Sequence, residues 1–246
     1  MKLSGKTALI TGGSSGIGLE TARLFIEEGS TVVILGRDQK RLASAVESLG
    51  TSAYGIAVDV AQPDALAAAI QQASRRLGGI DILFANAGVS ETPPIAATTE
   101  AAFDAFMGVN VKGTVFTVVN ALPLLRDGAS IVLTGSVAAR RGWPADPLYS
   151  ASKGAIRSFG RALAMDADIL SRLIRVNVVT PGATETNLAK AATEDPQVRQ
   201  YVADQVPMKR WGKAREVAEA VLFLGSDAAS YVTGSEITVD GGLAHV

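Results

Sequence analysis

The chain contains no cysteine, and its single histidine, His245, is the next-to-last residue. Without cysteine there is no disulfide and no thiolate metal site, which excludes the zinc type of alcohol dehydrogenase. One histidine also excludes a histidine metal cluster and a Ser-His-Asp triad within one chain. We therefore expect no metal in the site, and we expect His245 to be a terminal surface residue.

An excess of charge of one sign is also missing. The 23 Lys and Arg residues nearly balance 24 Asp and Glu residues, for a formal net charge of −1. This balance provides no basic field for nucleic acid and no polybasic membrane patch. No apolar run reaches the roughly 18 residues that span a membrane, and the first residues do not resemble a signal peptide. We expect a cytoplasmic protein without nucleic-acid or membrane partners.

Short apolar runs alternate with longer helical patterns along the whole chain. The runs lie at 7–11, 31–35, 54–58, 80–85, 130–134, 175–179 and 236–239, and the helical patterns lie near 17–28, 39–49, 63–77, 100–125, 150–169 and 214–224. Continuous β-branched runs are typical of strands covered on both faces. The alternation predicts one α/β domain over residues 1–246, a doubly wound parallel sheet with helices on both faces.

Two segments interrupt this alternation. Residues 91–99 contain Pro93-Pro94 and are predicted to form a loop. Residues 181–205 form a long connection, rich in Thr, Ala and charged residues, with Pro196 inside it. So long a connection in a compact domain is often a lid over a site, and a plain surface loop is the alternative.

The first predicted strand ends in the glycine-rich sequence Thr11-Gly-Gly-Ser-Ser-Gly-Ile-Gly18, which opens the first helix. Its spacing, Gly-x-x-x-Gly-x-Gly, differs from the common dinucleotide fingerprint, but the physics is the same. Missing side chains permit a tight turn and let the backbone and the helix N-terminus approach a pyrophosphate. The sequence predicts a cofactor-binding turn made of Gly12, Ser14, Ser15, Ile17 and Gly18; a turn without ligand is the alternative.

The end of the second strand bears on the choice of cofactor. A carboxylate about 20 residues past the glycines holds the ribose of NAD, but Gly36 stands there, followed by Arg37. A guanidinium suits a 2′-phosphate, which favours NADP(H) over NAD(H). Lys40 and Arg41 add positive charge, whereas Asp38 is placed to pair with Arg37.

The strongest chemical signal is Tyr149-Ser-Ala-Ser-Lys153, read together with Ser136 just past the fifth predicted strand. Residues four apart share a face of a helix, so Tyr149 and Lys153 are expected side by side. An ammonium beside a phenol favours the phenolate, and we therefore expect Lys153 to lower the pKa of Tyr149. Ser136 falls at the strand ends, where α/β sheets build their sites. Alone, a Tyr-x-x-x-Lys pair is also found on ordinary helix surfaces.

Taken together, these motifs closely resemble the classical short-chain dehydrogenase/reductase family over essentially the whole chain. The resemblance rests on the glycine-rich turn, Asp59-Val60, Asn86-Ala-Gly88, Asn110, Ser136, Tyr149-x-x-x-Lys153, Pro181-Gly182 and a closing Asp240-Gly-Gly242. It implies seven parallel strands in the order 3-2-1-4-5-6-7 and helix-mediated homotetramers. Ala85 departs from the family, which often has a second asparagine there.

The resemblance also implies roles for individual residues. Tyr149 is the acid or base, Ser136 binds the substrate oxygen, Lys153 binds the nicotinamide ribose, and Asn110 holds a water of the proton relay. The remaining implied cofactor contacts are Asp59 and Val60 at the adenine, Asn86, Ala87 and Gly88 beside the cofactor, and Pro181, Gly182 and Thr184 around the nicotinamide.

The substrate is a small molecule, and its pocket is expected to be walled by Val137, Ala138, Pro93-Pro94, Trp143 and residues 183–206. Mostly apolar walls favour an apolar or aromatic ketone. Three alternatives stay open at this point: a 3-oxoacyl-(acyl-carrier-protein) reductase, an NAD-linked sugar or polyol dehydrogenase, and a non-catalytic NADPH sensor. For the first of these, the candidate docking residues are Arg140, Arg141, Arg157 and Arg161.

Overall fold

The computed structural model of the protein describes residues 1–142 and 146–244. Seven parallel strands form the central sheet, in the order β3-β2-β1-β4-β5-β6-β9. They are β1 (Thr7–Thr11), β2 (Thr31–Gly36), β3 (Ala53–Ala57), β4 (Ile80–Ala85), β5 (Leu125–Thr134), β6 (Arg175–Pro181) and β9 (Glu236–Val239). The predicted order is confirmed. The last strand is numbered nine because β7 (Thr184–Glu185) and β8 (Gly212–Lys213) pair apart from the sheet.

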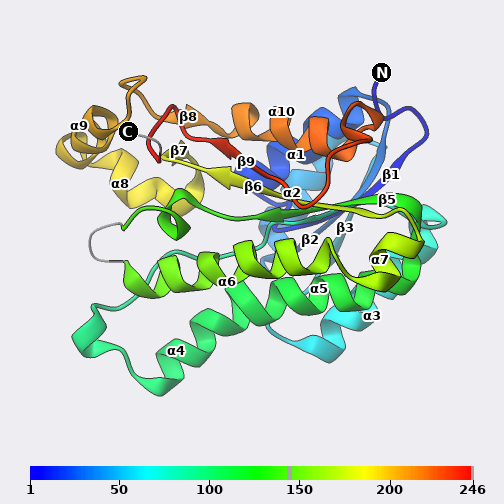
Figure 1. The fold of residues 1–246 in the computed structure, drawn as a ribbon, viewed down its shortest axis with the longest axis horizontal. Helices are drawn as coiled ribbons and strands as arrows, with labels where there is room; N and C mark the ends of the chain where they lie inside the picture. The colour runs from blue at the N-terminus through cyan, green and yellow to red at the C-terminus, as the bar shows by residue number, and fades with distance from the viewer. Residues whose placement is uncertain (143–145, 245–246) are drawn as a thin grey trace.

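Helices cover both faces of the sheet (Figure 1). One layer contains α1 (Gly16–Glu27), α2 (Gln39–Leu49) and α10 (Ala214–Gly225), and the other contains α3 (Pro63–Leu77), α5 (Thr114–Ala121) and α6 (Pro147–Leu163). Alternate strand residues feed the two layers. Leu9 and Leu83 pack toward α3 and α5, whereas Ile10 and Phe84 pack toward α1 and α10. Because successive strand residues point to opposite faces, apolar runs without polar alternation supply both cores.

The predicted helix at 100–125 is interrupted in its middle. It consists of α4 (Glu100–Met107), a π-helical turn η2 (Gly108–Gly113), α5 and a 3₁₀ turn η3 (Leu122–Leu124). Gly113 allows the close approach of this helix to β3's end, since a Cβ atom there would lie 2.8 Å from Val60 Cγ2. The strand β5 starts at Leu125 rather than at the predicted residue 130, so its pairing with β4 begins earlier along the chain.

The other differences concern two predicted segments. The helical pattern at 150–169 divides into α6 and α7 (Ala167–Ser171). The connection at 181–205 is largely helical, with η5 (Asn187–Ala189), α8 (Lys190–Glu194) and α9 (Pro196–Gln205). Asp195 begins α9 by accepting hydrogen bonds from the backbone N–H groups of Gln197 and Val198. Pro196 takes the first helical position, where its missing N–H carries no penalty.

One helical stretch of 25 residues, Glu100–Leu124, is long and apolar enough to cross a membrane by length and composition alone. Its α5 portion packs against α3 and β4, with Val118 and Ala121 inside the core cluster of that layer. Core helices of α/β domains pass the same test of composition, and this packing is that of a core helix.

Candidate active site

The glycine-rich turn lies between β1 and α1 and leaves no room for a side chain at Gly12 or Gly18. A Cβ atom on Gly18 would lie 2.3 Å from the Gly12 carbonyl oxygen, and one on Gly12 would lie 2.9 Å from Ala87 Cα. Gly12 and Gly16 have φ values of +67° and +53°, which favour glycine. Ser15 is the N-cap of α1, yet its side chain makes no capping hydrogen bond. The first N–H groups of α1 are thus left for an anion from outside the helix.

Asn86 joins this turn to the neighbouring strands. Its Nδ2 donates to the carbonyl oxygens of Thr11 (3.2 Å) and Gly12 (3.3 Å), and its Oδ1 accepts from Thr134 Oγ1 (3.2 Å). The backbone N–H groups of Asn86 and Ala87 both donate to Thr11 Oγ1. The ends of β1, β4 and β5 are therefore held together by one side-chain amide.

Asn110 lies within the π-helical turn η2 and is fully buried. Its Oδ1 accepts from Val89 N (2.8 Å), and its Nδ2 donates to Val89 O (2.9 Å) and Ser152 Oγ (3.2 Å). The side chain thus ties the segment after β4 to α6. Gly88 lies beside it, since a Cβ atom there would be 3.3 Å from Asn110 Oδ1 and 3.6 Å from Lys153 Nζ. Gly108 and Gly113 begin and end this π-helical turn.

Ser136, Tyr149 and Lys153 lie at the carboxyl ends of the strands. Ser136 is buried, caps the short turn η4 (Val137–Ala139) and accepts at Oγ from Ala138 N (3.2 Å). Lys153 is also buried, with Nζ donating to the Thr134 carbonyl (2.9 Å) and lying 5.7 Å from the centre of the Tyr149 ring. The structure therefore brings the three predicted catalytic residues together, and Asn110 reaches the same helix through Ser152.

The direction of the Tyr149 pKa shift differs from our expectation. Burial raises the pKa of Tyr149, a hydrogen bond with Ser136 lowers it, and the Asp146 carboxylate raises it further, so that the net direction is upward. Burial also lowers the pKa of Lys153 to about 8. The expectation of a lowered pKa for Tyr149 is wrong for this geometry, because desolvation of the phenol outweighs its hydrogen bond with Ser136.

At the predicted adenosine end of the site, Arg37 is exposed to solvent and Gly36 is closely packed. A Cβ atom on Gly36 would lie 3.0 Å from Ser14 Oγ. Asp38 caps α2 by accepting from Arg41 N (3.0 Å), and it pairs with the Arg41 guanidinium (3.6 Å). Among the described residues, the acidic neighbour of Arg37 is therefore engaged by Arg41.

Asp59 and Val60 follow β3 on the same edge of the sheet. Asp59 Oδ1 accepts from Ala61 N (2.9 Å), which fixes the turn into α3, and Val60 is buried against Gly113. This places both residues on the side of the sheet where β2 ends, as an adenine site requires.

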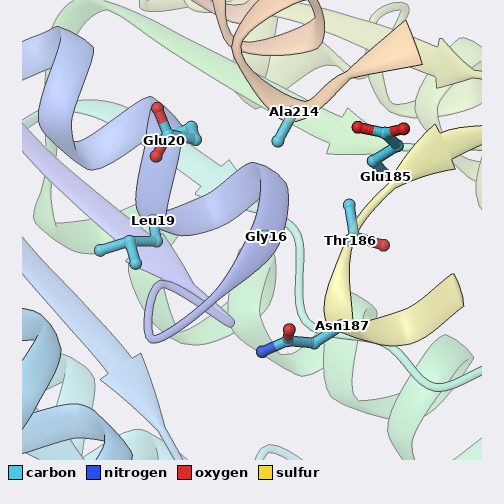
Figure 2. Close-up of a pocket in the computed structure, with 7 residues that line it drawn as sticks. All are labelled: Gly16, Leu19, Glu20, Glu185, Thr186, Asn187 and Ala214. Atoms are coloured by element: carbon cyan, nitrogen blue, oxygen red, sulfur yellow. The ribbon is translucent and has the colours of Figure 1, made fainter. Parts of the chain in front are cut away.

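A cavity of about 340 Å³ separates the glycine-rich turn from the segment after β6 (Figure 2). It is lined by Gly16, Leu19, Glu20, Glu185, Thr186, Asn187 and Ala214. Gly182 is packed against Asp240, where a Cβ atom would lie 2.6 Å from the Asp240 Cβ. The predicted contact residue Thr184 is buried, and its Oγ1 donates to the Gly182 carbonyl (3.0 Å).

Two groups in the site were missed by the sequence analysis. Thr186 faces Gly16 across the cavity, with its Cβ 3.2 Å from where a Gly16 Cβ would lie. Asp146 begins α6, and its carboxylate accepts from Thr92 Oγ1 (2.8 Å). Asp146 stands directly before Pro147, a helix-start signal that points to a capping residue but not to a place in the site. The predicted wall residue Trp143 and the predicted surface residue His245 lie outside the described residues.

Comparison with known proteins fits this geometry. A family model described as "Enoyl-(Acyl carrier protein) reductase" matches residues 12–244. The chain is 40% identical to "Oxidoreductase asL5" of Sarocladium schorii, covering 100% of this chain and 98% of that protein. The chain belongs to the classical short-chain dehydrogenase/reductase family. It is an oxidoreductase of this family, whose members use a nicotinamide cofactor.

Two further family members extend the comparison. The chain is 36% identical to "Versicolorin reductase stcU" of Emericella nidulans, over 98% of this chain and 96% of that protein. A blue fluorescent protein from a metagenomic library, solved in complex with NADPH, has a TM-score of 0.92 and 31% identity, with 99% of this chain and 100% of that chain covered.

The residues of this chain fit a nicotinamide dinucleotide. The uncapped first turn of α1 borders the cavity through Gly16, and the neighbouring turn leaves no room for side chains at Gly12 and Gly18. An anionic pyrophosphate suits such a helix start.

Proposed function

We propose that this short-chain dehydrogenase/reductase is an NADP(H)-dependent carbonyl reductase that interconverts apolar or aromatic ketones and secondary alcohols. One observation carries the proposal: buried Ser136 and Lys153 converge with half-buried Tyr149 at the strand ends, near the glycine-rich turn and an uncapped helix start. That arrangement combines an acid, an oxygen-binding hydroxyl and an ammonium in one site.

The mechanism follows from the two hydroxyls. Ser136 and Tyr149 donate to the carbonyl oxygen of the substrate, and Tyr149 transfers its proton to that oxygen as negative charge develops. The raised pKa of Tyr149 keeps the phenol protonated at neutral pH, which suits reduction. Lys153 is held by the Thr134 carbonyl on the side of the tyrosine ring, where it stabilises the phenolate left behind. When bound, the reduced nicotinamide supplies the hydride to the carbonyl carbon.

The cofactor would be held along one edge of the sheet. Gly12, Ser14, Ser15, Ile17 and Gly18 would hold the pyrophosphate, and Asp59 and Val60 would border the adenine. Asn86, Ala87, Gly88, Pro181, Gly182 and Thr184 would border the nicotinamide half, with Lys153 and Tyr149 at its ribose. Exposed Arg37 beside Gly36 supports NADP(H), because Asp38 is engaged by Arg41 and not by Arg37.

The first experiment is NADPH oxidation by the purified protein with a panel of aryl ketones, 3-oxoesters, diketones and sugars. Tyr149→Phe removes the proton donor and keeps the ring, so kcat should fall by about 10²–10⁴-fold. The Kd for NADPH should stay within a few-fold of the wild-type value. Wild-type turnover by this variant would refute the role of Tyr149, and tight NADPH binding without turnover on any carbonyl would favour a sensor.

Cofactor choice is tested separately by titrating NADPH and NADH into the wild type and Arg37→Leu. Loss of a guanidinium–phosphate contact should weaken NADPH binding by roughly tenfold or more and leave NADH binding nearly unchanged. Equal dissociation constants for the two cofactors in the wild type would reject the NADP(H) assignment.

The walls around the reacting centre support an apolar substrate. Val137 and Ala138 follow Ser136 directly, and Leu188 reaches the loop before α4 through a hydrogen bond from Ser90 Oγ to its carbonyl. The relative named a versicolorin reductase supports reduction as the reaction.

A 3-oxoacyl-(acyl-carrier-protein) reductase is the second candidate, favoured by the description of the matching family model. However, Arg140, Arg157 and Arg161 all face the buried carboxylate of Glu236, at 3.7, 2.7 and 3.7 Å. These arginines therefore serve an internal ion-pair cluster, which weakens them as a carrier-docking face. Turnover of a 3-oxoacyl thioester at a higher kcat/KM than any simple ketone would select this second function.

We also propose a cytoplasmic homotetramer. Phe103, Phe116 and Val119 on α4 and α5 are 44%, 37% and 52% exposed, which is unusual for such large apolar side chains. A second copy of the same helices would cover them. Sedimentation that gives the mass of a single chain would contradict this assembly.

A further inference from the structure

A carboxylate stands at the entrance of the helix that bears Tyr149. Asp146 is the N-cap residue of α6 and directly precedes Pro147, and its side chain makes no capping hydrogen bond. The Asp146 carbonyl accepts from the N–H of Ser150 (3.1 Å) and from Ser150 Oγ (3.0 Å). The position of this residue is therefore set by the same first helical turn that carries Tyr149.

The other side of the carboxylate is held by the loop before α4. Thr92 Oγ1 donates to Asp146 Oδ1 (2.8 Å), and Ser90 in the same loop donates to the Leu188 carbonyl. Asp146 thus lies where the start of α6 meets this loop, at the edge of the molecule that also carries α8 and α9 (Figure 1). This is the edge at which the substrate carbonyl must reach Ser136 and Tyr149.

The negative charge of Asp146 has no cation against it among the described residues. Burial raises the pKa of the Asp146 carboxyl, the hydrogen bond from Thr92 lowers it, and no lysine or arginine of the described residues forms an ion pair with it. The ammonium of Lys153 donates to the Thr134 carbonyl. The negative charge of Asp146 contributes to the raised pKa of the Tyr149 hydroxyl.

We propose that Asp146 is a specificity determinant that restricts this enzyme to ketones without negative charge beside the reacting carbonyl. The inference rests on the proposed reductase function and names its substrate class: neutral aryl ketones and oxoesters are accepted, whereas 2-oxo and 3-oxo carboxylates are excluded. A carboxylate next to the carbonyl would be repelled by the half-buried carboxylate of Asp146, three residues before Tyr149. An ester at the same position carries no such charge.

The test compares ethyl benzoylformate with benzoylformate, which place an ester or a carboxylate directly on the same aryl ketone. The measured quantity is the ratio of kcat/KM for the ester to kcat/KM for the acid. In Asp146→Asn this ratio should fall by about tenfold or more, because the charge that repels the acid is removed. Asp146→Glu keeps the charge and should keep the high ratio.

Ser150→Ala is the matched control, because Ser150 contacts Asp146 through its backbone carbonyl and carries no charge. Its ratio should equal that of the wild type. If Asp146 only held the loop and the helix together, Asp146→Asn would lower kcat/KM for both ketones in parallel, and that result would overturn the inference.

Binding provides a readout that does not require turnover. The Kd of each ketone for the NADPH complex, followed by the fluorescence of bound NADPH, should show the same change of ratio in Asp146→Asn. Absence of NADPH oxidation with every ketone would reject the reductase proposal, whereas an unchanged Kd ratio would reject the role of Asp146. Circular dichroism and the Kd for NADPH identify a variant that fails to fold. In that case Thr92→Val and Asp146→Glu test whether charge or loop attachment controls selectivity. Thr92→Val keeps the charge and should keep the ratio.

Discussion

At the glycine-rich turn, a Cβ atom on Gly18 would lie 2.3 Å from a carbonyl oxygen, so the turn itself is formed by closely packed backbone. At the start of α6, the shape and the charge come from side chains: the phenol of Tyr149, the ammonium of Lys153 and the carboxylate of Asp146. The cofactor end is therefore intolerant of added atoms, whereas the substrate end is sensitive to changed charge.

This difference matches what each end has to bind. A pyrophosphate is the same in every turnover, and backbone N–H groups at a fixed helix start suit it. A substrate must be selected and protonated, which requires groups whose pKa and polarity depend on their surroundings. Single substitutions at the two ends should consequently change different measured quantities.

The largest effect is expected for Gly18→Ala. The new methyl group meets backbone atoms that cannot move independently, and we expect a loss of about 2–3 kcal/mol in the free energy of unfolding, at the upper end of overpacking effects. NADPH binding should weaken by more than about tenfold, which corresponds to roughly 1.4 kcal/mol. Chemical denaturation and NADPH titration measure the two quantities.

Gly154→Ala is the control for that substitution. Gly154 lies inside α6, and a Cβ atom there meets nothing within 4 Å. Since alanine favours a helix interior over glycine by roughly 0.5–1 kcal/mol, this variant should be slightly more stable than the wild type. Similar behaviour of the two variants would remove the contrast between a backbone-built and a side-chain-built end.

The next effect concerns the charge of Lys153 and its dependence on pH. Burial lowers its pKa from 10.5 to about 8, so between these values the unfolded chain binds a proton that the folded protein does not. The contribution of Lys153 to stability therefore increases as the pH rises, by about 1 kcal/mol between pH 8 and pH 9.

Lys153→Met lacks this titration. The difference in unfolding free energy between the wild type and Lys153→Met should thus shift in favour of the wild type as the pH is raised from 8 to 9. Tyr149 acts in the opposite sense only near and above its ordinary pKa of 10, because its raised pKa favours the neutral phenol in the folded state. A difference that is flat over this range would show that Lys153 is not desolvated.

The cofactor end was largely predictable because its requirements are steric. Gly12, Gly18 and Gly36 stand where no other residue avoids a close contact, and the alternation of apolar runs and helical patterns predicts the doubly wound parallel sheet, whose strand order came from the family resemblance. The helical distortion at Asn110 falls between two glycines, residues that disfavour a regular helix.

The substrate end was less predictable because its properties depend on burial, which the sequence does not display. Spacing correctly placed Tyr149 and Lys153 on one helix, but desolvation reversed the expected direction of the Tyr149 pKa. Asp146 carries no motif, and its contact with Thr92 joins residues 54 positions apart. The helices α8 and α9 were missed since a segment rich in Thr, Ala and charge has no apolar periodicity long enough to indicate them.

The smallest effect is expected where two loops of the substrate end touch. Ser90 Oγ donates to the Leu188 carbonyl at 3.4 Å, a long hydrogen bond between exposed groups. Ser90→Ala should change kcat/KM for a good ketone by less than about threefold, since solvent-exposed hydrogen bonds of this length contribute well below 1 kcal/mol. Steady-state kinetics beside Thr92→Val, whose hydroxyl makes a 2.8 Å bond to Asp146, would rank the two loop contacts. A larger effect for Ser90→Ala would mean that attachment of the loop to the segment after β6, rather than the charge of Asp146, organises the substrate end.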